Sequence, residues 1–261
     1  KFQYDPDYYL KISNSIEVNP YFYFCIKHTE GDFHRTFPFN QCLNIGKHRQ
    51  VVEIQASREY EGKGAYPNYI ADGVMNGCEE FKWLMKEDQA QSLKDVINCP
   101  DSLICGIWTW SRGGGWGGPY INGENGPDGE TKIKGGCELW SDVNAYVVTQ
   151  WAKDTSYSDK YYALKYAKEE LHMSEKDAEI FYEILIMSAR AILLGRGRNT
   201  SAYEWDVFWT RDQNIEYPRV LANIKYAERE GKTDLMLEEK HRSVEIWEYI
   251  LSLSEKISDD V

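Results

Sequence analysis

The stretch YFYFCIKHTEGDFHRTFPFNQCLNIGKHRQVVEIQASREYEGKG, residues 21–64, decides the fold. It holds two apolar, β-favouring runs, Tyr21–Lys27 and Val51–Gln55, and a near-continuous run of this kind is typical of a strand buried on both faces. A third run, SLICGIWTW, covers Ser102–Trp110. Each run passes into a polar segment that contains glycine. The pattern predicts parallel strands with functional side chains beyond their C-terminal ends, as in a (β/α)-barrel.

Helical patterns separate and follow these runs. Asp72–Lys86 carries apolar residues at helical spacing. From about residue 142 the chain turns helical, and we expect helices at Asp142–Lys153, Ser158–Leu171, Ser174–Leu194, from Asn214 or Tyr217 to Gly231, and at Thr233–Ile257. The expected fold class is α/β then all-α: residues 1–140 form the last strands of a (β/α)8 barrel, and residues 141–261 form a helical C-terminal domain. Three strands cannot close a barrel of eight, so the earlier strands are expected upstream of Lys1.

Composition narrows the classes of partner. The formal charge of −12 argues against nucleic acid or an anionic membrane as the main partner. No run of eighteen apolar residues or signal peptide is visible, which leaves the compartment open, with the cytoplasm favoured. The six cysteines stand singly, which favours buried reduced thiols over a metal site or a disulfide framework. Nine Trp and nineteen Tyr exceed the usual need of a core, and carbohydrate sites use such rings as stacking platforms.

Two carboxylates follow the first two predicted strands. Asp32 comes just after the first and Glu59 just after the second, and adjacent parallel strands lie about 4.8 Å apart. Glycosidases use carboxyl pairs to protonate a leaving oxygen and to activate water, so both acids are candidate catalytic residues in one pocket. Basic residues surround them: Lys27, His28, Arg35, Lys47, His48, Arg49, Arg58 and Lys63. This cluster indicates an anionic ligand such as a sugar carboxylate or a phosphate, although pairing at a solvated loop rim accounts for many of the charges.

The third predicted strand ends in WTWSRGGGWGGPY, residues 108–120. Its glycines allow the backbone to approach a ligand closely. We expect Trp108 to fill the core and Trp110 to reach the site. Trp116 is expected to stack on a sugar, and Arg112 to meet an anionic group. The glycine run lacks the G-K-[ST] ending of a phosphate loop.

The segments IKHTEGDF and VVEIQASREYEGKG together resemble the family-67 glycoside hydrolases, the α-glucuronidases. That family carries I-K-N-G-P-x-D-F and L-E-F-Q-I-T-Q-E-Y-x-G-Q at nearly the same separation. The resemblance implies that Asp32 and Glu59 flank the attacking water and that Lys27 helps to bind glucuronic acid. It continues more loosely at residues 142–154. Departures include His28 in place of an Asn and Arg58 in place of a Gln.

The function that this resemblance implies is an inverting α-glucuronidase that removes (4-O-methyl)glucuronic acid from xylan-derived oligosaccharides. No metal or organic cofactor is needed, and the general acid belongs to an earlier barrel strand. Which of the two acids is the base stays open. The alternatives are a glycosidase of another sugar specificity and a non-catalytic carbohydrate-binding fragment. The expected partners are a uronic-acid-bearing glycan and the N-terminal half of the barrel, and the helical region is a candidate homodimer surface. The expected substrate-binding residues are Lys27, His28, Arg35, Arg58, Trp110, Arg112 and Trp116.

Overall fold

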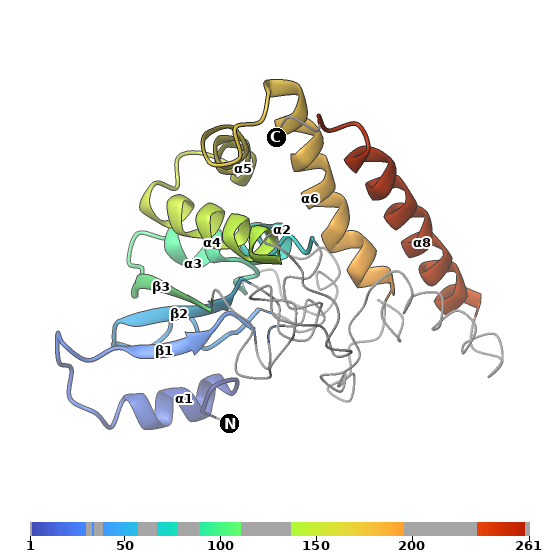
Figure 1. Cartoon of the computed structure of the whole chain (residues 1–261). Coiled ribbons are helices and arrows are strands. Elements are labelled where there is room, and N and C mark those ends of the chain that lie inside the picture. Colours follow the sequence, from blue (N-terminus) through green and yellow to red (C-terminus); the bar gives the residue numbers. More distant parts are fainter. Residues whose placement is uncertain are drawn as a thin grey trace, which may run out of the picture.

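The computed structural model describes residues 2–29, 33, 39–56, 67–77, 89–110, 137–195 and 234–258. Its elements are α1 (Pro6–Ser13), β1 (Phe24–Lys27), β2 (Gln50–Gln55), α2 (Ala71–Val74), α3 (Leu93–Ile97), β3 (Ile104–Trp110), α4 (Cys137–Lys153), α5 (Asp159–Glu169), α6 (Glu175–Gly195) and α8 (Asp234–Ser254). Figure 1 shows α1 lying beyond β1, with α3 and α4 on the β3 side of the sheet. The long helices α6 and α8 pack against each other.

The three strands form one sheet in the order β1-β2-β3, and both pairs are parallel. This confirms the three predicted strands, although β1 begins at Phe24 and not at Tyr21. The ladder starts where the Phe24 N–H donates to the Arg49 carbonyl at 3.0 Å. Before that point the Tyr21 N–H donates to Asn19 Oδ1, and the Tyr21 ring is 89% exposed. The local turn therefore holds Tyr21 outside the sheet.

One face of the sheet supplies the hydrophobic core. Ile26, Val52 and Ile54 are at most 1% exposed on this face. The same core cluster continues without a break into α4, α5 and α6, where it includes Trp151 and Phe181. A second cluster joins α6 to α8 and contains Ile184, Ile192, Trp247 and Ile250. The predicted domain boundary near residue 140 stays a prediction. The first apolar cluster contains residues from both sides of it.

Capping side chains fix several helix starts. Ser158 Oγ accepts from the Tyr161 N–H at the start of α5, and Ser174 Oγ accepts from the Asp177 N–H at the start of α6. Both starts are predicted from the sequence. The sequence analysis misses α1, whose start is the pair Asp5-Pro6, with Asp5 as N-cap and Pro6 in the first turn. It also starts α4 too late, because the helix begins at Cys137.

Two further helix expectations fall largely on undescribed residues. Of the predicted helix Asp72–Lys86, residues 78–86 lie outside the described residues, and the described part overlaps the short helix α2. Non-helical backbone interrupts α2 at Gly73, where φ is +99°. The predicted helix Asn214–Gly231 lies wholly outside the described residues. Within the described part of the chain, no helix is long and apolar enough to cross a membrane.

The cysteine expectation is wrong for two residues. Cys25 and Cys105 carry free thiols on exposed parts of β1 and β3, whereas Cys42 is free and buried. The apolar runs suggested strands covered on both faces. In the structure the core covers one face, so Cys25, between buried Phe24 and buried Ile26, is exposed on the other.

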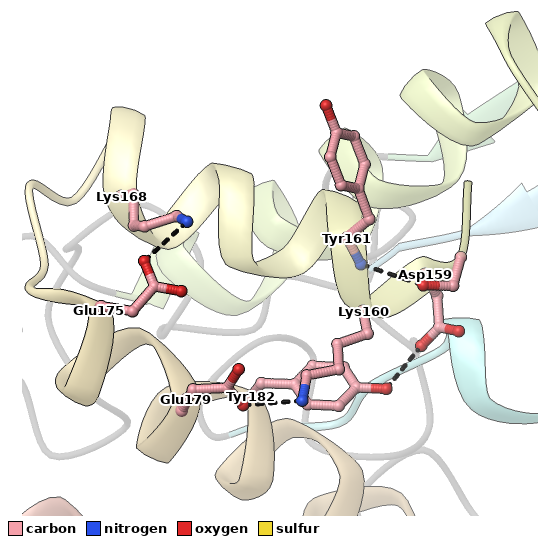
Figure 2. Close-up of polar contacts among 8 residues, drawn as sticks. Asp159, Lys160, Tyr161, Lys168, Glu175, Glu179 and Tyr182 are labelled. Atoms are coloured by element: carbon pink, nitrogen blue, oxygen red, sulfur yellow. Dashed lines mark hydrogen bonds and ion pairs between the residues drawn. The ribbon is translucent and has the colours of Figure 1, made fainter. Parts of the chain in front are cut away.

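A buried carboxylate ties α5 and α6 to the loop after β2. Asp159 Oδ2 accepts from the hydroxyls of Tyr69 at 3.2 Å and Tyr182 at 3.1 Å, and Oδ1 accepts from Asn76 Nδ2 at 3.3 Å. Figure 2 shows Tyr182 of α6 reaching Asp159 at the start of α5. The nearby ion pair Lys160–Glu179 is half-exposed and contributes little to stability by comparison.

The buried Tyr69 hydroxyl makes stability depend on alkaline pH. Burial raises the pKa of Tyr69 well above its ordinary value, and the negative charge of Asp159 raises it further. The folded state therefore keeps Tyr69 neutral at a pH where the unfolded chain ionises it. This contribution is fully present below about pH 10 and is lost as the pH rises above it. We expect Tyr69→Phe to reduce the alkaline loss of unfolding free energy by up to about 1.4 kcal/mol per pH unit, measured by urea unfolding between pH 9 and 11. Tyr21→Phe, at an exposed ring, should follow the parent curve; identical slopes in all three proteins would contradict the assignment.

Candidate functional site

The C-terminal ends of the three strands lie along one edge of the sheet because all three run in the same direction. β1 ends at Lys27, β2 at Gln55 and β3 at Trp110, and Gln55 pairs with Trp110. Most of the predicted site lies outside the described residues, namely Asp32, Glu59, Arg35, Arg58, Arg112, Trp116 and the side chain of Trp110. The structure therefore locates Lys27 and His28 among the predicted site residues, together with the backbone of Trp110.

Lys27 is half-buried at the end of β1. Its Nζ lies 4.9 Å from the centroid of the Phe33 ring, within the range of a cation–π interaction. Phe33 is the residue that follows Asp32 in the sequence. The Lys27 ammonium is thus positioned at the sheet edge where the predicted site is expected.

His28 is buried, with 4% of its surface exposed. It lies two residues after Ile26, so the alternation of a strand turns it toward the same core-facing side. Its ring stacks on Phe33 at 5.6 Å between centroids, and its backbone N–H donates to the Glu53 carbonyl at 3.0 Å. The surroundings of His28 are those of a packed ring, and its contact with a substrate stays a prediction.

A row of three unlike side chains crosses the other face of the sheet. Lys27 pairs with Glu53, and Glu53 pairs with Trp108, so the three Cβ atoms project to the same side. Trp108 is 46% exposed, and the expectation that it fills the core is wrong. The reason is the register, which places Trp108 on the face away from Ile26 and Val52. We call Lys27, Glu53 and Trp108 the cross-strand row.

Glu53 also influences a neighbouring thiol. The Cys25 thiol donates to Glu53 Oε2 at 3.9 Å. Burial raises the pKa of Cys25, and the charge and hydrogen bond of Glu53 raise it further. Glu53 therefore acts as a negative centre beside Cys25 on this face.

Asn40 clamps the chain where it leaves β1. Its Nδ2 donates to the carbonyls of Lys27 at 3.0 Å, Thr29 at 3.1 Å and Gln3 at 2.7 Å. Its own N–H donates to the His28 carbonyl, and a β-bridge joins Thr29 to Phe39. Asn40 is fully buried. The two ends of the segment that separates residue 29 from residue 39 are thereby held together.

Asn144, on α4, performs the same role at the end of β2. Its Nδ2 donates to the carbonyls of Ala56 and Asn68, both at 2.9 Å, and its Oδ1 accepts from the Ile70 N–H at 2.9 Å. It is 2% exposed, so all three bonds are shielded from water. One amide thus joins the two ends of the connection between residues 56 and 68 to the helical layer.

The sequence analysis missed both asparagines as positioning residues. A signal was present for Asn144, which stands in the helical segment DVNAYVV among apolar residues. An amide at a core position of a helix indicates buried hydrogen bonding. Asn40 offers no such signal, because the surrounding sequence TFPFNQCLN has neither helix nor strand periodicity.

The described residues contain no group of three His, Cys, Asp or Glu side chains that could hold a metal ion. In comparisons with known proteins, no family model, curated protein or solved structure matches the chain. The assignment of a function therefore depends on the residues and their geometry.

Asn144 offers a direct test of the clamp at β2. Asn144→Ala leaves two carbonyls and one N–H unpaired in a buried site, and each such group costs about 1–3 kcal/mol. We expect the free energy of unfolding to fall by about 3 kcal/mol or more, measured by urea denaturation. Asn19→Ala is the matched control, since it removes one exposed bond to Tyr21 and should cost less than about 1 kcal/mol. Equal losses in both variants would show that the buried bonds of Asn144 do not stabilise the fold.

Proposed function

We propose that this protein is a glycoside hydrolase that removes an α-linked uronic acid, such as glucuronate, from xylan-derived oligosaccharides. One observation carries the proposal. Three consecutive parallel strands end along one edge of a sheet, and Lys27 stands at the first of these ends. The chain then runs from β1 toward Asp32 and from β2 toward Glu59. This arrangement supports a (β/α)-barrel active-site face, where catalytic residues follow the strands.

The proposed reaction inverts the anomeric centre. Asp32 or Glu59 takes a proton from a water molecule, whose oxygen attacks the anomeric carbon as the glycosidic bond breaks. A protonated carboxylic acid of the full-length protein gives its proton to the leaving oxygen, so charge and atoms balance. No metal or organic cofactor enters this scheme.

Lys27 has a defined electrostatic task in this proposal. A uronate carboxylate near two carboxylate side chains is repelled by both, and a fixed cation must offset that repulsion. Lys27 is half-buried, which weakens the screening of its charge by solvent. The contact of its Nζ with the Phe33 ring restricts where that charge lies.

A second candidate function is carbohydrate binding without catalysis. The exposed indole of Trp108 favours it, since a flat ring beside the Glu53 carboxylate suits sugar recognition whether or not the bond breaks. Turnover separates the two candidates. A binding module would retain oligosaccharides without releasing uronic acid.

The acids provide the main test. In the full-length protein, Asp32→Asn or Glu59→Gln should lower kcat by about two orders of magnitude or more, because a general base contributes that much. Uronic acid release is measured by chromatography, and oligosaccharide binding should survive. Asp101→Asn is the control, since Asp101 is exposed before the N-terminal end of β3, at the opposite edge of the sheet. Near-parent turnover in both acid variants would refute the assignment.

Lys27 tests the substrate class. A hydrogen bond between charged groups contributes about 1.5–3 kcal/mol, which corresponds to roughly a ten- to hundredfold effect. We expect Lys27→Ala to reduce kcat/KM on a glucuronoside by that factor and to spare the matching neutral glucoside. Lys47→Ala should leave both unchanged, since the structure places this exposed lysine before the N-terminal end of β2, at the edge opposite to the predicted site, where it donates to the Asn14 carbonyl. Equal losses on the two substrates would make Lys27 structural and would point to another sugar.

A further inference from the structure

Glu53 and Trp108 lie beside Lys27 in the cross-strand row, and the proposed reaction gives neither of them a task. The row occupies the sheet face opposite to the core, where Trp108 is 46% exposed. A half-exposed indole in mid-strand keeps a large apolar surface in water. Such a ring has the chemistry of a stacking platform.

The length of the row sets the size of the ligand. Neighbouring strands lie about 4.8 Å apart, so Lys27 and Trp108, two strands apart, are separated by about 10 Å at their Cα atoms. This distance suits two linked sugar rings. Glu53 lies between the two ends, on the middle strand β2.

A glycine keeps the face open beside Trp108. Gly106 lies two residues earlier on β3 and pairs with Val51, so it belongs to the same face. The nearest atom that a Cβ at Gly106 would meet is Val51 Cγ2, at 4.0 Å. The flank of the indole along β3 is therefore not filled by a side chain of residue 106.

We propose that the cross-strand row is a two-ring subsite for a uronic acid linked to a neutral sugar. The uronate carboxylate meets Lys27, and the neutral ring stacks its C–H face on Trp108. Between them, the Glu53 carboxylate accepts hydrogen bonds from ring hydroxyls, and bonds to an ionised acceptor are the stronger kind. This inference rests on the proposed function and extends it, because it assigns the neutral ring to Trp108 and the ring hydroxyls to Glu53.

Calorimetry tests the subsite with two defined ligands, glucuronic acid and glucuronic acid α-linked to xylose. The full-length Glu59→Gln variant serves as background so that the disaccharide stays intact. We expect the disaccharide to bind more tightly than the monosaccharide. Adding Trp108→Ala should weaken the disaccharide about tenfold and leave glucuronic acid unchanged, since the stacking contact is made by the neutral ring alone.

Two further variants separate stacking from folding. Trp108→Phe keeps an aromatic face and should restore most of the disaccharide affinity. Tyr21→Ala removes a more exposed ring away from the sheet and should change neither affinity. Thermal unfolding of each variant is followed in parallel, and Trp108→Ala is expected to melt close to its background because its ring is half-exposed.

Thiol footprinting gives a readout that needs no change to the row. Cys25 lies on the same face, two residues before Lys27, and its thiol bonds to Glu53. The disaccharide should slow the alkylation of Cys25 by iodoacetamide, measured by mass spectrometry. Cys99, near α3, is the internal control and should react at an unchanged rate.

The outcomes are distinguishable. Equal affinities for the two ligands, or equal losses of both in Trp108→Ala, would overturn the two-ring subsite and leave the glycosidase proposal standing. Unprotected Cys25 at a saturating disaccharide concentration would also overturn it. A Trp108-dependent self-association of the protein would show that a second copy covers this face, which likewise excludes the subsite. Release of uronic acid at the parent rate by both Asp32→Asn and Glu59→Gln would instead refute the catalytic assignment.

Discussion

Parallel pairing governs how the side chains of β1, β2 and β3 meet, and the β2–β3 register is continuous from Val51 onward, after a shift between Gln50 and Val51. Because successive residues of a strand point to opposite faces, the pairing of Lys27 with Glu53 and of Glu53 with Trp108 assigns every neighbouring residue to a face. Ile26 and Val52 then meet the helical layer. A slip of one residue would exchange the two faces, exposing the apolar set and burying the charged one. The core, the cross-strand row and the aligned strand ends all follow from this pairing of the three strands.

Buried polar side chains join the strand ends and the loops after them to the rest of the fold. Asn40 and Asn144 satisfy backbone groups where the chain leaves β1 and β2, and Asp159 gathers the hydroxyls of Tyr69 and Tyr182. A fully bonded buried network orders its surroundings more strictly than apolar contact does, because its hydrogen bonds have preferred directions. The apolar core supplies most of the drive to fold. The amides decide where the chain segments beyond the strands begin and end.

Local sequence signals predicted the helices and strands better than they predicted which face of each strand is buried. The β-branched run at β2 and the serine caps of α5 and α6 act within a few residues, so they can be read from the chain directly. The face of β3 could not be read in this way. Ile104 and Ile107 are apolar and so is Trp108, so the alternation that would distinguish a core side from an open side is absent. Only the pairing with Glu53 places Trp108 on the open face.

The residues of the candidate site also differ in how far the sequence predicts them. Lys27 could be predicted as a site residue because it ends an apolar strand. Glu53 could not, because a single charge within an apolar run does not indicate which residues lie next to it in the sheet. The apolar neighbours of Asn144 indicate a buried amide, but its three partners could not be predicted, since they lie between 74 and 88 positions away in the sequence. The backbone-only character of that clamp has an evolutionary consequence. Asn144 recognises two carbonyls and one N–H, and these are present whatever side chains the connection carries. The side chains between residues 56 and 68 can therefore change without loss of the anchor, which separates variation in this connection from the survival of the fold.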